Sequence, residues 1–297
     1  LEQIEPFTLL LTRPQCEVMR VIQTQALANG HLDLTVADPQ GYRRDLHFTR
    51  ENEAGLQLLP ADSPHMLCDP EAIRACLLGG AVGDALGAPV EFMHWQEIKR
   101  EFGKAGIRDY ATAYGQLGSI TDDTQMMLFT AEGLLRACVR SEAHGICHPP
   151  SAIHHALLRW LLTQSEKPVH RSQEGNPELE IGNDGWLFQE RRLWSRRAPG
   201  NTCIGALRQS RHFGDLARNN SKGCGGVMRV APCAFFSNSF ETAADSARMS
   251  HGHPTGYLAA GLFADILSRM WRHCQPPLKA LQESLQEHGD KPCMDET

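Results

Sequence analysis

Apolar residues recur at helical spacing over most of the chain that follows residue 66. Apolar positions three and four residues apart are typical of helices that turn one face to a core. The segments between these runs are rich in Gly, Pro, Asn and Ser, which is typical of loops. We therefore expect an all-α domain, compact in shape, over residues 67–297. Its predicted helices cover Glu71–Leu86, Thr124–Arg140, Ser151–Gln164, Trp186–Arg196 and Thr255–Arg272.

The first 66 residues follow a different pattern. A helical pattern covers Pro14–Ala28. The sequence H-L-D-L-T-V, which begins at His31, alternates with period two, and a second strand is expected over Leu46–Phe48. Residues 60–64 have the composition of a linker. We therefore predict that residues 1–66 form a small α+β N-terminal module that interacts with a partner.

Composition narrows the classes of protein to consider. The chain has 297 residues, of which 41% are apolar, and its formal net charge is −6. Its basic residues are dispersed, which does not favour binding of nucleic acid. No apolar run is long enough to span a membrane, and the ten cysteines include no C-x-x-C pair. These features predict a cytoplasmic protein with reduced thiols and with neither a nucleic-acid nor a membrane partner.

The strongest candidate for a functional site is S-I-T-D-D-T-Q-M-M, residues 119–127. Asp and Thr often cap helices, and carboxylates are favoured at the positive end of a helix dipole. Here, however, Asp122 and Asp123 come directly before an apolar helix. Carboxylates at the edge of a core repel each other unless a cation neutralises them, and oxygen-only ligands suit Mg²⁺, Mn²⁺ or Ca²⁺. The spacing leaves two interpretations open, a hard-metal site and a double helix cap.

Glycines recur every four residues in the first predicted helix of the domain, at Gly79, Gly83 and Gly87. Each glycine costs about 1 kcal/mol relative to alanine in a helix, which favours close packing of a neighbouring helix as the reason for them. Asp84 lies in the same apolar helix, so its carboxylate must be paired, capped by hydroxyls or near a site. Glu91 follows on a loop, either as a solvated residue or as a group over a cleft.

A glycine-rich stretch, K-G-C-G-G-V-M-R-V-A-P, covers residues 222–232. Its glycines let the backbone turn sharply and direct N–H groups at a ligand, as phosphate-binding loops do. The stretch lacks G-K-[ST] and follows no predicted strand, so the known nucleotide-loop fingerprints do not apply. Arg229 is either a buried structural arginine or a phosphate partner. The stretch S-H-G-H-P, from Ser250, adds two histidines that are either cap residues or ligand contacts.

Together and in this order, these motifs resemble the ADP-ribosylglycohydrolase family, and most closely its dinitrogenase reductase-activating type. The resemblance runs from about residue 70 to residue 275, and the order and number of the motifs make it specific. The matching stretches are G-D-A-L-G-A-P-V-E-F, T-D-D-T-Q-M, A-P-G-N-T-C, K-G-C-G-G-V-M-R-V-A-P and S-H-G-H-P. The resemblance implies a compact all-α fold with two Mg²⁺ ions at the bottom of a cleft that holds ADP-ribose.

The resemblance also implies roles for individual residues. By motif position, Thr121, Asp122 and Asp123 correspond to metal ligands, and Glu91 corresponds to a glutamate near the metals. Glu91 or Asp123 would act as the catalytic base. A bulky side chain at Gly226 is expected to weaken ADP-ribose binding more than it lowers the melting temperature. The implied substrate contacts are Gly225, Gly226, Val227 and Met228 around the diphosphate and His251 near the ribose and adenine.

The implied activity is hydrolysis that removes ADP-ribose from modified protein side chains, with arginine as the expected acceptor. Members of the family normally carry a second acidic motif, G-G-D-x-D-T, near the C-terminus, and nothing of that form follows His253. We expect either that the given sequence stops short of this motif or that half of the metal site is lost.

The N-terminal module resembles the extensions of immunity proteins that act against ADP-ribosylating toxins. Two functions therefore remain open. One is an ADP-ribosylglycohydrolase, and the other is a binding or immunity protein that blocks a toxin and has an impaired hydrolase domain.

Overall fold

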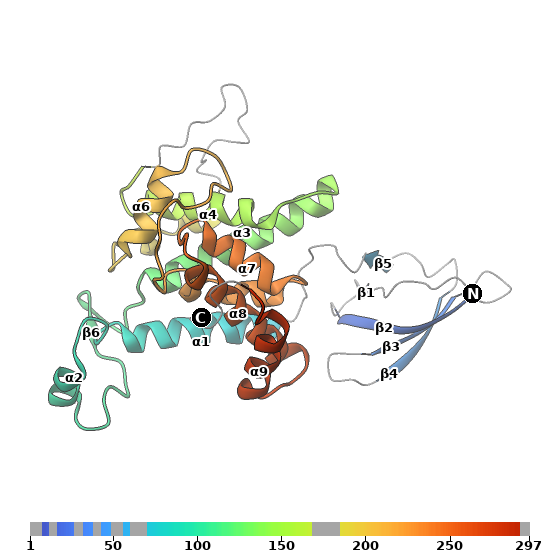
Figure 1. Ribbon diagram of the computed structural model, residues 1–297, viewed down its shortest axis with the longest axis horizontal. Coiled ribbons are helices and arrows are strands. Elements are labelled where there is room, and N and C mark those ends of the chain that lie inside the picture. The colour runs from blue at the N-terminus through green and yellow to red at the C-terminus, as the bar shows by residue number, and fades with distance from the viewer. Residues whose placement is uncertain are drawn as a thin grey trace.

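Helices form the described chain from residue 70 onward, and strands form the described chain before it (Figure 1). This computed structural model describes residues 8–11, 17–26, 32–37, 43–48, 56–59, 70–167 and 185–291. The predicted all-α class of the domain is confirmed. Its helices are α1 (Pro70–Gly87), α2 (Trp95–Phe102), α3 (Asp122–His144), α4 (Pro149–Thr163), α5 (Trp186–Gln189), α6 (Asn201–Gln209), α7 (Ser239–Arg248), α8 (Pro254–Arg272) and α9 (Pro277–His288), with a short hairpin of β6 (Thr112–Ala113) and β7 (Gln116–Leu117) before α3.

Helices α3 and α4 pack side by side at the centre of the helical part (Figure 1). Helix α4 is buried on nearly all sides, and Trp160 is among the largest side chains in the core. Gly133 allows the two helices to approach closely, because a Cβ atom there would lie 2.5 Å from the Ile153 Cα atom. Helices α7 and α8 form a second pair against this core. The α3–α4 pair therefore gives the N-terminus of α3 a rigid base.

The buried Gln125 amide ties the loop before α6 to this pair. Its Nε2 group donates to the Ser195 carbonyl oxygen at 2.9 Å. Its Oε1 atom accepts from the Trp160 indole N–H and from the Gln164 side-chain amide, each at 3.1 Å. Buried polar groups need partners of this kind. Gln125 thereby fixes the course of the chain that leads to Gly200, beside the acidic motif.

The structure confirms four predicted helices, with small shifts at their ends, as α1, α3, α4 and α8. The prediction of one helix over Trp186–Arg196 is wrong. Helix α5 ends at Gln189, and a separate 3-10 helix follows at Arg191–Leu193. Glu190 interrupts the pattern because its backbone is extended and its carboxylate accepts a hydrogen bond from the Arg192 N–H at 3.1 Å. A local side-chain cap thus overrides the helical periodicity.

The expected close packing on the glycine face of α1 is not observed among the described residues. A Cβ atom at Gly79, Gly83 or Gly87 would meet no atom within 4 Å. Leu78 is 55% exposed, and Ala85 is the only buried residue of this apolar helix. Helix α1 therefore contacts the described domain along one narrow side.

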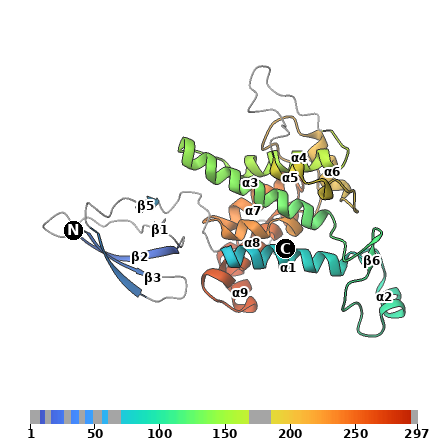
Figure 2. The same ribbon diagram turned by 180° about the vertical axis from the view of Figure 1, so that it is seen from behind.

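The described strands of the N-terminal part form one antiparallel sheet with the order β4-β3-β2-β1-β5. Both views show it beside the helical part (Figures 1 and 2). The predicted hairpin is confirmed, with Leu34 opposite Leu46. The predicted linker, residues 60–64, lies outside the described residues. The strands are β1 (Thr8–Leu11), β2 (Glu17–Ala26), β3 (Leu32–Ala37), β4 (Arg43–Phe48) and β5 (Leu56–Leu59).

The predicted helix over Pro14–Ala28 is wrong where the structure describes it. Residues Glu17–Ala26 form strand β2, which pairs with β1 on one side and with β3 on the other. The segment is rich in β-branched residues, which favour strands, and two neighbours satisfy its backbone hydrogen bonds.

Among the helices that are described, none is long and apolar enough to cross a membrane.

Candidate functional site

The two aspartates of the T-D-D-T motif lie in the first turn of helix α3. Thr121 is the N-cap residue, and its hydroxyl accepts a hydrogen bond from the Asp123 backbone N–H at 3.3 Å. Asp122 is buried, and its carboxylate accepts a bond from the Gly200 N–H at 3.2 Å. The Asp123 carboxylate accepts no hydrogen bond from any residue that the structure describes. Thr121 therefore accounts for the cap, and the capping interpretation leaves the two carboxylates unexplained.

Asp84 stabilises this helix end from a different helix, α1. Its carboxylate accepts from the Thr121 N–H at 2.8 Å and from the Thr121 hydroxyl at 2.7 Å. It also accepts from both the backbone N–H and the hydroxyl of Thr124. A carboxylate at a helix N-terminus satisfies unpaired N–H groups and interacts favourably with the helix dipole. Two of the alternatives for Asp84 therefore hold. The hydroxyls of Thr121 and Thr124 cap its carboxylate, and the residue lies beside the candidate site.

Negative charge is crowded at this end of α3. Burial, followed by the charges of Asp123 and Glu91, raises the pKa of Asp122 to about 7. Burial and the charges of Asp84 and Glu91 raise the pKa of Asp123 to about 6. The pKa of Glu91 is also raised, by burial and by Asp84. No ion pair joins these four carboxylates to a lysine or arginine within the described ranges. We call Asp84, Glu91, Asp122 and Asp123 the acid cluster.

The β6–β7 hairpin adds a tyrosine to the acid cluster. Tyr114 and Gly115 form its turn, and both have positive φ angles, 51° and 78°. Two such residues suit the twist of a tight hairpin, but the conformation costs a residue other than glycine about 1–3 kcal/mol. Burial and then the charge of Glu91 raise the pKa of the Tyr114 hydroxyl. Tyr114 was not among the site residues predicted from the sequence, although the Tyr-Gly pair between two short strands was a usable signal.

The acid cluster supplies ligands of the type that Mg²⁺ prefers. Oxygen atoms of Thr121, Asp122 and Asp123 lie at one helix end, and the excess negative charge there would be relieved by a divalent cation. Across residues 70–167 and 185–291, no three His, Cys, Asp or Glu side chains gather closely enough to hold one ion. The type of donor, two carboxylates and one hydroxyl at this helix end, nevertheless fits a hard metal.

Arg229 determines the shape of the glycine-rich loop. Its guanidinium is fully buried and donates to the Gly225 carbonyl oxygen at 2.9 Å, to the Ser246 carbonyl oxygen at 3.1 Å and to the Ser250 hydroxyl at 2.7 Å. These contacts occupy it with protein groups. Of the two alternatives for Arg229, the structure therefore shows the structural one.

His251 lies against the same loop. Its Nδ1 atom is 2.8 Å from the Ser250 hydroxyl oxygen, and a Cβ atom at Gly225 would lie 2.9 Å from its ring. Burial and the positive charge of Arg229 lower the pKa of His251 to about 4. The ring is therefore neutral at pH 7. His253, in contrast, is the N-cap residue of α8, and its Nδ1 atom accepts from the Thr255 N–H at 3.2 Å.

The other predicted contacts of the loop face the protein interior. Val227 and Met228 pack against the hydrophobic core as part of a 3-10 helix. A Cβ atom at Gly226 would lie 2.9 Å from the Ala247 Cβ atom in α7. A bulky residue at Gly226 must displace that helix, so the geometry now favours a lower melting temperature as its main effect. Val227 and Met228 are only partly buried, so these two residues and the backbone of Gly226 remain candidates for ligand contact.

Helix α6 connects the loop to the acid cluster. Gly200, at its N-terminus, donates to Asp122, and the Cys203 thiol lies 3.9 Å from the Gly225 carbonyl oxygen. The Thr202 hydroxyl is 3.4 Å from the Ser221 hydroxyl. The structure thus brings together the T-D-D-T, A-P-G-N-T-C, glycine-rich and S-H-G-H-P motifs. Helix α6 was not predicted from the sequence, because it is short and carries a glycine at its centre.

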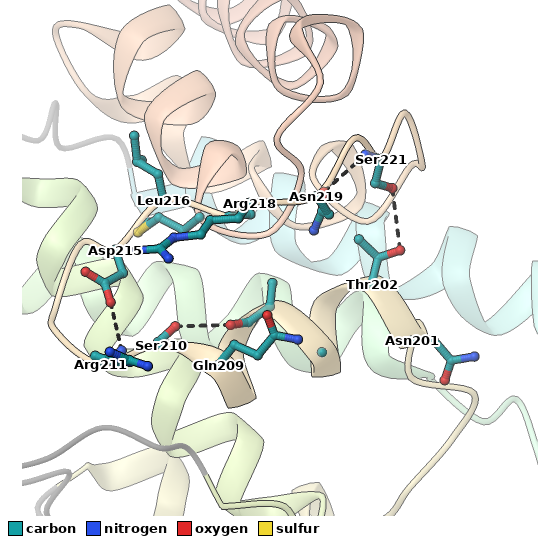
Figure 3. Close-up of a pocket in the computed structure, with 14 residues that line it drawn as sticks. Asn201, Thr202, Gln209, Ser210, Arg211, Asp215, Leu216, Arg218, Asn219 and Ser221 are labelled. Atoms are coloured by element: carbon teal, nitrogen blue, oxygen red, sulfur yellow. Dashed lines mark hydrogen bonds between the residues drawn. The ribbon is translucent and has the colours of Figure 1, made fainter.

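A polar cavity of about 740 Å³ extends along α6 from this junction (Figure 3). Its size is within the range of small-molecule sites. Figure 3 shows α6 on one side and the segment of residues 215–221 on the other. Its polar lining includes Asn201, Thr202, Gln209, Arg211, Arg218 and Ser221. The cavity therefore offers a site for a polar molecule beside the glycine-rich loop.

The family model of the ADP-ribosylglycohydrolases matches residues 68–296. The chain belongs to the ADP-ribosylglycohydrolase family. A relative from Rhodospirillum rubrum, the ADP-ribosyl-[dinitrogen reductase] glycohydrolase, is 29% identical over 192 residues, which cover 60% of this chain and 50% of that protein. An uncharacterised protein from Archaeoglobus fulgidus is 32% identical over 199 residues, covering 64% of this chain and 52% of that protein.

This ADP-ribosylglycohydrolase chain spans about half the length of these curated relatives. No solved structure gave a significant match. The family match begins at residue 68, after the last described strand of the sheet, and it includes the acid cluster, α6 and the glycine-rich loop. The sequence motifs that resembled the family therefore fall within the matched part.

Proposed function

We propose that this protein hydrolyses the bond between ADP-ribose and a modified protein side chain, with arginine as the acceptor. The observation that carries the proposal is the acid cluster, whose negative charge is not neutralised by any described cationic side chain. Helix α6 connects this cluster to the glycine-rich loop, because Gly200 contacts Asp122 and Cys203 lies near Gly225. Membership of the ADP-ribosylglycohydrolase family supports the class of reaction.

In this reaction the bond from the anomeric carbon of the ribose to the side-chain nitrogen breaks, and a water oxygen bonds to that carbon. The transition state resembles an oxocarbenium ion, and the charges of Asp122 and Asp123 stabilise it. Glu91 or Asp123 takes the proton from the water. The leaving guanidine nitrogen keeps the electron pair of the broken bond and gains a proton. The pKa of Asp123, which is raised to about 6, suits it to proton transfer near neutral pH, and burial and Asp84 raise the pKa of Glu91 in the same direction.

Thr121, Asp122 and Asp123 are the residues that would hold Mg²⁺. When bound, such ions orient the ribose hydroxyls and lower the pKa of a coordinated water. The resemblance to the family implies two ions. Asp84 takes no direct part, since hydrogen bonds from Thr121 and Thr124 occupy its carboxylate, but it keeps Thr121 in place.

The nucleotide end of the substrate would lie along α6. Backbone N–H groups of the glycine-rich loop would hold the diphosphate, as they do in other phosphate-binding loops. The neutral ring of His251 lies behind that loop, and the polar cavity beyond Ser221 has room for the remaining nucleoside. Glu91, the carboxylate of the acid cluster that neither holds Mg²⁺ nor binds Thr121 and Thr124, would attract a positively charged guanidinium group, which supports arginine as the acceptor.

Release of ADP-ribose from an arginine-modified protein tests the proposal. We expect release that depends on Mg²⁺, and we expect Asp123→Asn to reduce it at least about 100-fold, because removing one charge stabiliser typically costs 10²–10³ in rate. Asp109→Asn, at an exposed aspartate outside the acid cluster, is the matched control. If the wild-type chain binds ADP-ribose and releases none in any divalent metal, the chain is a binding protein and the hydrolase proposal fails.

We further propose that residues 1–66 are a separate interaction module, with an ADP-ribosylating toxin as the candidate partner. The described strands of this part pair only with one another in a single sheet, and the family match begins only at residue 68. Both observations support the division. Deletion of residues 1–66 should leave affinity for ADP-ribose within about two-fold and abolish binding of the partner. Loss of ADP-ribose binding in a deletion variant with native helical content would assign the module to the active site instead.

A further inference from the structure

A second groove lies beside the segment that leads into the acid cluster, because Ser119 and Ile120 are part of its lining. It has a volume of about 870 Å³ and lies between the approach to α3 and the segment that contains α5 and the 3-10 helix after it. Its lining includes Gln116, Ser119, Trp186, Arg191, Trp194 and Arg197. We call it the arginine groove. It is distinct from the cavity in Figure 3, and the proposed reaction does not use it.

Arg197 forms a wall that the groove shares with the acid cluster. Its backbone carbonyl oxygen accepts from the Asp122 N–H at 3.2 Å. Its guanidinium lines the groove and donates to the Ile120 carbonyl oxygen at 2.9 Å, one residue before Thr121. The groove and the acid cluster therefore share Arg197 as a boundary, and a polypeptide with its modified side chain at the acid cluster would lie next to the groove.

The groove combines positive charge with aromatic surface. The Arg191 guanidinium stacks on Trp194, with 4.3 Å between its central carbon and the ring centroid. Trp186 is 56% exposed. Neither Arg191 nor Arg197 pairs with a carboxylate of any described residue, and the one acidic residue of the lining, Glu190, is paired with Arg192 at 2.7 Å. Tryptophan and arginine are the residues most enriched at the energetic centres of protein interfaces.

The charges of the two neighbouring sites are opposite. The acid cluster attracts a cation at the point of reaction, whereas the arginine groove attracts anions next to it. A nucleotide does not need this groove, because the polar cavity along α6 already accepts it in the proposed function. The complementary occupant is an extended polypeptide with acidic residues close to the modified one.

We propose that the arginine groove binds the acidic segment of the target protein that flanks the ADP-ribosylated residue. This inference rests on the proposed function and adds the kind of target that the enzyme selects. The groove then explains how a small acid cluster could distinguish one modified protein from others, since free ADP-ribose makes no contact there. Because the arginines are near the surface, salt should weaken the preference.

Two fluorescent peptides, each ADP-ribosylated at a central arginine, test the inference with the full chain. One carries glutamates within three residues of that arginine, and the other carries lysines there. Fluorescence anisotropy in Mg²⁺, with Asp123→Asn present in every chain so that the peptides are not cleaved, gives each affinity, and displacement by free ADP-ribose gives the affinity of the nucleotide site. We expect the glutamate peptide to bind at least ten-fold more tightly at low salt. Arg191→Ala should reduce this preference to within two-fold and change the affinity for free ADP-ribose less than two-fold.

Arg100→Ala is the matched control, because Arg100 is an exposed arginine of α2 outside the groove. It should keep the full preference for glutamate. Equal binding of the two peptides, or a preference that survives Arg191→Ala, would overturn the inference while binding of ADP-ribose leaves the proposed function standing. Absence of both ADP-ribose binding and hydrolysis would instead overturn the proposed function and the inference with it. Dimerisation of the wild-type chain that Arg191→Ala abolishes in sedimentation velocity would assign the groove to a second copy and also overturn it.

Discussion

Two aspartates of the acid cluster show how neighbours decide the role of a carboxylate. Asp84 accepts hydrogen bonds from the backbone and hydroxyl groups of Thr121 and Thr124, which occupy its carboxylate. Asp122 is buried near other acids and accepts one bond from Gly200, so its charge is poorly compensated. The first residue builds the helix end, and the second is available for a cation or a substrate.

The pKa of Asp122 has a measurable consequence for stability in metal-free solution. In the folded chain its pKa is about 7, against an ordinary value of 3.8. Stability from the protonated carboxyl is therefore complete below pH 3.8 and is lost as the pH rises towards 7. Asp122→Asn removes this loss. In EDTA, we expect the melting temperature of the variant relative to wild type to rise between pH 5 and pH 8.

Saturating Mg²⁺ should reverse that result at pH 8, because the wild-type carboxylate then has a partner and the asparagine does not. Asp109→Asn is the control and should show the same small difference at both pH values. A melting-temperature difference for Asp122→Asn that is independent of both pH and Mg²⁺ would contradict the assignment of a raised pKa.

At the scale of helices and strands, the spacing of apolar residues predicted an element correctly where that element packs against the core along its length. Helices α3, α4 and α8 are long and repeat their apolar positions, and the sequence predicted them. Strand β2 has a pattern compatible with either state, and its two neighbouring strands decided the outcome. At α5, the carboxylate of Glu190 ended a helix that the apolar pattern alone would continue. Such local caps and distant pairings are not visible in periodicity.

Gly133 sets how closely α3 and α4 pack. A Cβ atom there would overlap the Ile153 backbone, which cannot move aside as a flexible side chain could. We expect Gly133→Ala to lower the free energy of unfolding by about 1–3 kcal/mol, the usual cost of overpacking a core. Urea denaturation followed by circular dichroism measures it.

Gly79→Ala is the matched control, since it changes a helical glycine whose Cβ position is open. That substitution should stabilise the chain by up to about 1 kcal/mol through helix propensity alone. Equal effects of the two substitutions would show that the α3–α4 distance is not limiting.

At the scale of the whole molecule, the segment from Arg197 to Thr202 organises the candidate site. It touches Asp122 twice, through the Arg197 carbonyl oxygen and the Gly200 N–H, and it separates the polar cavity from the arginine groove. The sequence predicted the motif residues because they are unusual in type and spacing. It could not predict the two cavities, because the folding of residues 201–221 back on themselves shapes the first, and two segments distant in sequence, 116–128 and 186–197, form the second.

The sparse packing of α1 implies that the acid cluster is assembled from parts of unequal stability. Asp122 and Asp123 begin a helix that is buried deep in the core, whereas Asp84 and the loop with Glu91 depend on α1, where Ala85 alone is buried. Segments with few buried contacts open first in native-state amide hydrogen exchange. We expect the amides of α1 to exchange faster than those of α4, and ADP-ribose with Mg²⁺ to slow α1 selectively. Protection of α1 equal to that of α4 in the unliganded protein would contradict this. If ADP-ribose with Mg²⁺ slows exchange in α1 selectively, ligand binding at the acid cluster is also the event that completes the folding of α1.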